Sequence, residues 1–227
     1  MVMAHGFTSD KNSNGRFNIL ANAFTKAGFS VLTFDFSGCG ESDDDRLTLE
    51  KEVDDLKSAI QFVKSRGYQT IGLYGHSLGS LICLKSYTSD IKTMVLSGAL
   101  TNAMKYDWEQ YFTKEQMKEL KEKGYITIQR TGTWRHTIVV DKQMLRDFED
   151  IRQPELLQRV TCPVLIIHGN SKKDEEELLL LERSQQGMQY LSKDSRLKVI
   201  DGATHSFLEH LEILKDLSTR WYVNHMS

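Results

Sequence analysis

Residues 70–79 read Thr-Ile-Gly-Leu-Tyr-Gly-His-Ser-Leu-Gly, and this stretch decides the fold. The apolar run Thr70–Tyr74 leads directly into Gly75-His76-Ser77-Leu78-Gly79, and a helical pattern follows from Leu78 to Tyr87. Between a strand and a helix, a G-x-S-x-G pattern places its serine on a sharp turn with the hydroxyl exposed. Side chains larger than glycine two residues to either side would collide with neighbouring backbone. The stretch therefore predicts Ser77 as a nucleophile.

Short apolar runs alternate with longer helical patterns along most of the chain. The runs are almost wholly apolar inside, which is typical of parallel strands buried on both faces. The helical patterns carry apolar residues at a spacing of three and four. This alternation predicts a mostly parallel α/β sheet of about six strands with helices on both faces. The expected strands are Val2–His5, Phe29–Phe36, Thr70–Tyr74, Thr93–Ser97, Val164–His168 and Leu197–Asp201.

One segment, Thr101–Arg159, breaks this alternation. It contains a helical stretch, Trp108–Lys123, then two β-rich runs around a turn at Thr131-Gly132-Thr133, and a second helical stretch. We expect a small helix-hairpin-helix cap, residues 101–159, inserted into a single domain of residues 1–227. An insertion of this length is usually a lid over a site, and a packed decoration without function is the alternative.

A second motif, Gly202-Ala203-Thr204-His205, follows the last expected strand. A loop that leaves a parallel strand reaches over the carboxyl edge of the sheet, where the sites of α/β proteins lie. A histidine with a pKa near 6.5 can take the proton of a serine hydroxyl and return it to a leaving group. We therefore predict that His205 is the general base for Ser77.

A third motif, His5-Gly6-Phe7-Thr8, follows the first expected strand. Acyl transfer develops negative charge on a carbonyl oxygen, which backbone N–H donors stabilise. One donor comes from the residue after the nucleophile, here Leu78, and a second from a loop such as this one. We expect the amides of Phe7 and Leu78 to form an oxyanion hole, and an ordinary turn is the alternative for residues 5–8.

Together these motifs resemble the landmarks of the α/β-hydrolases, and the resemblance runs from Met1 to about Val223. Within that superfamily of serine hydrolases, the chain is most similar to small esterases of the feruloyl and cinnamoyl esterase type. The stretch Phe34–Ser42 is a further part of the likeness, as is the short cap. The family implies an eight-stranded sheet, whereas this chain opens at what would be the third strand. Either the first two strands are absent or the sequence is truncated.

The resemblance also implies a carboxylate that orients the His205 ring, placed just after the strand Val164–His168. The loop there reads His168-Gly169-Asn170-Ser171-Lys172-Lys173-Asp174-Glu175, with extra residues compared with the family pattern. Asp174 is the expected acid, and the order Ser77, Asp174, His205 fits the family. Glu175 is the nearest alternative, and Asp107 is the next acid to consider.

The composition of the chain argues against several classes of partner and cofactor. The formal net charge of −2 over 227 residues argues against nucleic acid as the main partner. Three widely spaced cysteines without a C-x-x-C pattern argue against a disulfide framework or a zinc site and favour the cytoplasm. No apolar run is long enough to span a membrane, and the N-terminal residues do not resemble a signal peptide. We expect no metal and no organic cofactor.

The resemblance implies a carboxylic-ester hydrolase that acts through an acyl-enzyme on a small or aromatic acyl ester. Another acyl hydrolase (a thioesterase, a monoacylglycerol lipase or a peptidase) is the nearest alternative. A non-catalytic scaffold of the same fold is a second, although such scaffolds usually lose the serine or the histidine, and both are present here. The expected partner is a small-molecule ester, and the long apolar run Phe29–Phe36 at a sheet edge leaves a homodimer open.

Overall fold

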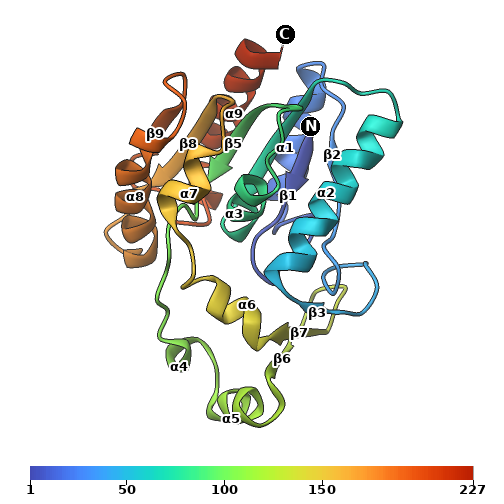
Figure 1. The fold of residues 1–227 in the computed structure, drawn as a ribbon, viewed down its shortest axis with the longest axis vertical. Helices are drawn as coiled ribbons and strands as arrows, with labels where there is room; N and C mark the ends of the chain where they lie inside the picture. Colours follow the sequence, from blue (N-terminus) through green and yellow to red (C-terminus); the bar gives the residue numbers. More distant parts are fainter. Residues whose placement is uncertain (227) are drawn as a thin grey trace.

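The computed structural model describes residues 1–226. Within them, six parallel strands form the central sheet in the order β2-β1-β4-β5-β8-β9 (Figure 1). This arrangement confirms the predicted sheet. The strands are β1 (Val2–Ala4), β2 (Leu32–Thr33), β4 (Ile71–His76), β5 (Ile91–Ser97), β8 (Val164–Gly169) and β9 (Arg196–Ile200).

Alternate side chains of the strands face two separate cores. On one face, Leu73 and Leu96 pack in a buried cluster with residues of α2, α3, α7 and α8. On the other face, Tyr74 and Val95 pack with residues of α1 and α9. Helices therefore cover both faces of the sheet, as predicted. Their bounds are α1 (Arg16–Lys26), α2 (Leu49–Ser65), α3 (Leu78–Lys85), α7 (Gln153–Gln158), α8 (Glu175–Gly187) and α9 (Leu211–Met226).

The expected edge strand Phe29–Phe36 is much shorter in the structure. β2 is at the edge of the sheet, as predicted, but only Leu32 and Thr33 pair with β1. Phe29 and Val31 pack against the α1/α9 core, while Leu32 and Phe34 pack against the opposite core. The apolar character of this run therefore serves packing on both faces more than a long hydrogen-bonded ladder.

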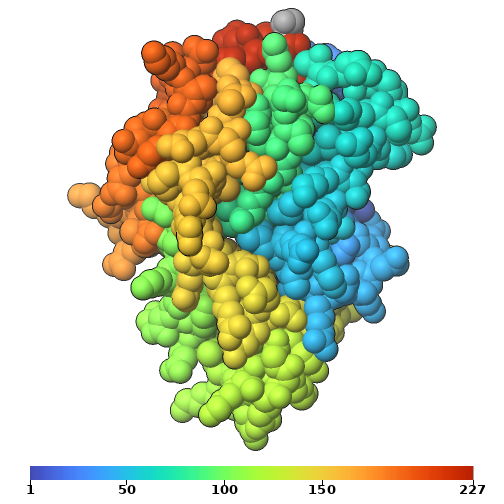
Figure 2. Space-filling model, viewed as in Figure 1, coloured from blue at the N-terminus to red at the C-terminus, as the bar shows by residue number. Residues whose placement is uncertain are grey.

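Residues 101–159 are called the cap segment below, and most of them form the lower part of the molecule in Figures 1 and 2. The last part of the segment, α7, packs beside α3 and α8 instead. The hairpin of β6 (Tyr125–Gln129) and β7 (Thr137–Asp141) has the predicted antiparallel pairing. It is joined by β3 (Arg46–Leu47), which follows β2 in the chain and pairs with β7. The small sheet β3-β7-β6 therefore joins the cap segment to the loop that carries residues 34–48.

The helical part of the cap segment differs from the expectation of one helix over Trp108–Lys123. The structure has two helices there, α4 (Trp108–Tyr111) and α5 (Lys114–Lys123). Thr113 starts α5 with a capping box: its side chain accepts from the Gln116 amide, and the Gln116 side chain accepts from the Thr113 amide. After the hairpin, α6 (Lys142–Asp147) leads back to α7.

Candidate active site

Ser77 lies on the turn between β4 and α3 in a strained backbone conformation, with φ of 54° and ψ of −125°. Its amide donates to the Ser97 carbonyl at 2.9 Å, which fixes the turn against β5. A Cβ at Gly75 would lie 2.6 Å from the Gly79 carbonyl oxygen, and one at Gly79 would overlap the Ala4 carbonyl oxygen. Close backbone contacts therefore require glycine at both positions, as the sequence analysis predicted.

Ser80 reinforces this turn in a way that the sequence analysis missed. Its hydroxyl donates to the Ser77 carbonyl at 2.5 Å and accepts from the Leu100 amide at 2.8 Å. Ser80 is fully buried, so these bonds are shielded from water. They join the strained serine to the loop after β5 and hold its backbone in place.

His205 lies in the loop after β9, and its ring is held in place on two sides. A Cβ at Gly98 would lie 2.7 Å from the Cε1 atom of the ring, so this glycine, which follows β5, makes room for the imidazole. The His76 ring lies 5.1 Å away between centroids. Nδ1 pairs with a carboxylate oxygen of Glu177 at 2.7 Å. This bond leaves Nε2 as the nitrogen that is free to act as a base.

The carboxylate beside His205 is Glu177, and neither Asp174 nor Glu175 takes the expected place. Both oxygens of Asp174 are engaged elsewhere: Oδ2 accepts from the His205 backbone amide at 2.7 Å, and Oδ1 accepts from the Glu177 amide at 3.0 Å. Asp174 is therefore the N-cap of α8 and a support for the His205 backbone. Glu175, the first residue of α8, is exposed.

The start of α8 explains this difference. With Asp174 as N-cap, the third helical residue turns back toward the sheet, and that residue is Glu177, which is fully buried. An aspartate followed three residues later by a glutamate is a pattern of helix N-termini. This pattern was the signal in the sequence that could have pointed to Glu177.

Glu177 joins two histidines. One oxygen accepts from His205, while the other accepts from the Gly169 amide at 2.8 Å and pairs with Nδ1 of His168, also at 2.8 Å. His168 is fully buried, and its Nε2 pairs with the Ser184 hydroxyl at 2.8 Å. The buried carboxylate thus has several donors, which offset the cost of removing it from water.

The charges in this group act on one another. Burial raises the pKa of Glu177, but hydrogen bonds and charges of His168 and His205 outweigh burial and lower the pKa to about 2. Burial lowers the pKa of His205, but the hydrogen bond and charge of Glu177 raise it more, so the net pKa lies above its ordinary value. Glu177 is therefore an anion at neutral pH and stabilises a protonated His205.

The expected oxyanion hole has a supporting geometry. Gly6 is packed beside the nucleophile, because a Cβ there would lie 3.3 Å from the Ser77 Cβ. His5 holds this loop: its Nδ1 bonds the Gly6 carbonyl at 2.9 Å, and its Nε2 accepts from the Phe36 amide at 3.2 Å. Within residues 1–226, no backbone acceptor binds the Phe7 or Leu78 amide. Neither N–H group is therefore used by the backbone of the described residues.

A cavity of about 430 Å³ opens beside Ser77. Ser77, Phe7 and Thr8 line it on the side of the sheet, and residues of the cap segment line the other side. Its wall is largely aromatic, and one carboxylate, Glu176, also lines it. The cap residues in the wall are Tyr106, Trp108, Tyr111, Phe112, Gln116, Ile128 and Phe148.

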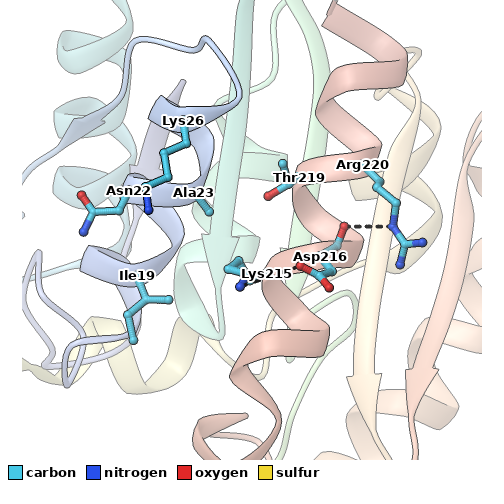
Figure 3. Close-up of a pocket in the computed structure, with 8 residues that line it drawn as sticks. All are labelled: Ile19, Asn22, Ala23, Lys26, Lys215, Asp216, Thr219 and Arg220. Atoms are coloured by element: carbon cyan, nitrogen blue, oxygen red, sulfur yellow. Dashed lines mark hydrogen bonds and ion pairs between the residues drawn. The ribbon is translucent and has the colours of Figure 1, made fainter.

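A larger hollow of about 650 Å³ lies between α1 and α9 (Figure 3). Charged side chains such as Lys26, Lys215 and Arg220 line it, and Arg220 bonds the Asp216 carbonyl within α9. Ser77 is not among its lining residues. Within residues 1–226, no group of three or more His, Cys, Asp or Glu side chains is arranged to hold a metal ion. The smaller cavity at Ser77 is therefore the candidate site.

Comparisons with known proteins agree with this fold. Residues 1–150 match the family model Hydrolase_4, described as serine aminopeptidase, S33. The chain is 24% identical, over all of its length and 88% of the relative, to a monoacylglycerol lipase of Mycolicibacterium smegmatis. It is also 25% identical, over all of its length and 91% of the relative, to an uncharacterized 31.7 kDa protein of Escherichia coli.

Two solved structures are similar with a TM-score of 0.75 each. One is the monoacylglycerol lipase of Paleococcus ferrophilus, at 19% identity with 99% of this chain and 93% of that chain covered. The other is Est1E of Butyrivibrio proteoclasticus with ferulic acid bound, at 20% identity with 99% and 88% covered. These likenesses confirm the predicted α/β-hydrolase fold.

Proposed function

We propose that this chain, which belongs to the Hydrolase_4 family described as serine aminopeptidase, S33, is a serine carboxylic-ester hydrolase. The observation that carries the proposal is the group around Ser77. Ser77 lies on a strained turn, and His205, with a free Nε2, is paired with the buried Glu177. The Phe7 and Leu78 amides have no backbone acceptor, and Ser77 and Phe7 line an aromatic cavity. These are the parts that acyl transfer requires.

In the proposed mechanism, the Ser77 hydroxyl attacks the ester carbonyl while His205 Nε2 takes its proton. The amides of Phe7 and Leu78 stabilise the oxyanion, and His205 then gives the proton to the leaving alcohol. Water hydrolyses the acyl-enzyme by the same steps with His205 as base. Glu177 fixes the tautomer of the ring and stabilises the imidazolium, the role that the sequence analysis had expected of Asp174.

A small or aromatic ester suits the cavity, because about 430 Å³ bounded by aromatic rings holds a compact apolar group. The names of the similar proteins support the same class, since they include monoacylglycerol lipases and an esterase with ferulic acid bound. The family description keeps a peptidase as the second candidate. Fold alone does not separate these acyl hydrolases.

The test combines covalent labelling with a substrate panel. A fluorophosphonate probe is expected to label the wild-type chain, and Ser77→Ala and His205→Ala are expected to lose labelling and ester hydrolysis. The panel contains p-nitrophenyl esters of increasing chain length, methyl ferulate and an aminoacyl p-nitroanilide. An unlabelled Ser77 would favour the non-catalytic scaffold, and turnover of the anilide alone would favour the peptidase.

The proposal includes a cellular compartment, the cytoplasm. The three cysteines are free and buried, which suits a reducing compartment such as the cytoplasm. Within residues 1–226, no helix is both long and apolar enough to cross a membrane. The proposed partner is a small-molecule ester.

A further inference from the structure

Glu176 is a carboxylate in the wall of an otherwise apolar cavity. Glu177, its neighbour, faces the sheet and His205, whereas Glu176 lines the cavity together with Ser77. Its oxygens accept from the Tyr106 hydroxyl at 2.8 Å and from the Tyr111 hydroxyl at 3.5 Å. Its charge also helps to raise the pKa of His205, so it acts within the site.

No ion pair within residues 1–226 neutralises Glu176. Arg183 is the cation whose charge acts on Tyr106, but it does not line the cavity. Asp174 adds negative charge near Tyr111. A half-buried carboxylate that pairs only with phenol hydroxyls leaves the cavity with an electrostatic preference for a positive ligand.

The aromatic rings point to the same ligand chemistry. Tyr106 and Trp108 lie 4.7 Å apart between ring centroids, and Tyr106 and Tyr111 lie 5.6 Å apart. Phe112 and Phe148 extend the group from Trp108. Aromatic faces attract cations, best when the cation has lost its water, and quaternary ammonium ligands are bound in this way. Among the described residues, the cation–ring contacts lie at Tyr125 and Phe62, outside this cavity.

We infer that the cavity recognises an ester that carries a quaternary ammonium group, of the choline-ester type. The ammonium group lies between Glu176 and the aromatic rings while the ester carbonyl meets Ser77. This inference rests on the proposed ester hydrolysis and names its substrate class. A purely structural role of Glu176 would be to join Tyr106 and Tyr111 to α8. Glutamine could still bond both, accepting from one hydroxyl through its oxygen and donating to the other through its NH2 group.

The experiment uses two thioesters of the same shape that differ only in charge. Acetylthiocholine carries a trimethylammonium group, and 3,3-dimethylbutyl thioacetate replaces its nitrogen with carbon. Thiol release gives kcat/KM for both. For the wild-type chain we expect the cationic substrate to be preferred on the order of tenfold, the size of one desolvated cation–ring and carboxylate contact.

Glu176→Gln is expected to bring that ratio close to one, mainly through a lower kcat/KM for the cationic thioester. Glu175→Gln is the matched control, because it removes the same charge from an exposed neighbour and should leave the ratio unchanged. Choline should protect Ser77 from a fluorophosphonate probe better than 3,3-dimethylbutan-1-ol does, which is a readout independent of turnover.

The outcomes separate the two proposals. Hydrolysis of both thioesters at equal rates by the wild-type chain overturns the ammonium inference and leaves the esterase proposal standing. An equal loss on both substrates in Glu176→Gln, with choline protection unchanged, also overturns it and assigns Glu176 a structural role. Absence of hydrolysis and of labelling at Ser77 overturns the esterase proposal itself.

Discussion

At the scale of single residues, the proposed mechanism depends most on the contact between Glu177 and His205. The Glu177 carboxylate holds Nδ1 of His205 at 2.7 Å and is itself held by His168 and Gly169. Asp174 contacts the same histidine only through the backbone. The two acids therefore have separable effects, one on the ring and one on the loop.

Glu177→Gln is predicted to lower kcat on the order of 10⁴-fold with the fold intact, because the amide no longer stabilises the imidazolium or its tautomer. Asp174→Asn should cost far less activity and little stability, because asparagine caps a helix about as well as aspartate does. Steady-state hydrolysis of a p-nitrophenyl acetate and thermal unfolding measure both effects. A larger kcat loss in Asp174→Asn would restore Asp174 as the acid.

The raised pKa of His205 predicts the pH profile. The neutral ring is the base, so the rate is lost as pH falls through the pKa of His205, and its midpoint should lie above the ordinary 6.5. Glu176 contributes to this shift through its charge, so Glu176→Gln should lower the midpoint. The measurement is kcat/KM for a neutral ester between pH 5 and 9. A midpoint that rises in the variant would contradict the assigned electrostatics.

The places of Ser77 on the turn after β4 and of His205 in the loop after β9 could be predicted from the sequence because each motif directly follows an apolar strand. Their catalytic roles stay proposals. The sequence could not single out Glu177 as the partner of the histidine, because Asp174 to Glu177 are four consecutive acids. They differ only in the direction in which each side chain points from the helix. Those directions depend on which residue caps α8, and the apparent insertion before α8 makes its first residue hard to predict. His168 and Ser184 come together only through the buried face of α8.

At the scale of elements, the hairpin β6–β7 is tied to the loops around the site by two arginines. Arg130 donates to the Thr8 carbonyl, next to Phe7 of the proposed oxyanion hole. Arg135 donates to the carbonyls of Gly40 and Ser42 and pairs with Asp44. Cap residues such as Ile126 and Val140 also belong to a core cluster that includes Leu73, so the cap segment is part of the core.

Arg130→Met and Arg135→Met form a matched pair that tests this coupling. Arg130→Met is predicted to lower kcat about tenfold on a small acetate ester with KM nearly unchanged, because the oxyanion donors act in the transition state. Arg135→Met should lower the melting temperature and change kcat by less than threefold. Equal kcat losses in both variants would show that the hairpin acts through stability alone.

The break between α4 and α5 shows how far local sequence patterns predict the helices of the cap segment. Apolar spacing over Trp108–Lys123 suggested one helix, but Thr113 and Gln116 form a capping box that starts a new one. The capping-box pattern is present in the sequence, but the helical pattern of the whole stretch favoured a single helix. By contrast, β3 pairs with β7 across about 93 residues of sequence, from Arg46 to Val139. A strand of two residues is too short to show the alternation of apolar and polar residues by which strands are predicted.

At the scale of the whole molecule, the site lies where the topology predicts. Ser77 follows β4, His205 follows β9, and Phe7 follows β1, so all three are delivered to the carboxyl edge of one parallel sheet. The cap segment covers that edge and closes the cavity with aromatic rings. The sheet positions the proposed reacting groups, and residues of the cap segment form the aromatic wall of the cavity.

The remaining prediction concerns the free edge of the sheet at β2. A long apolar edge would favour pairing with a second chain, but only Leu32 and Thr33 form strand there. Two residues offer a few backbone hydrogen bonds at about 1 kcal/mol each, which is too little against an association cost of roughly 4–15 kcal/mol. The neighbouring apolar side chains already pack on the two cores.

We therefore predict a monomer for residues 1–227 in sedimentation velocity at micromolar concentration. Thr33→Pro, which blocks pairing through the β2 backbone, should leave the sedimentation coefficient unchanged. A concentration-dependent dimer in the wild-type chain that Thr33→Pro dissociates would show that the edge is used after all. A dimer that resists Thr33→Pro would place the contact elsewhere on the surface and separate it from the sheet edge.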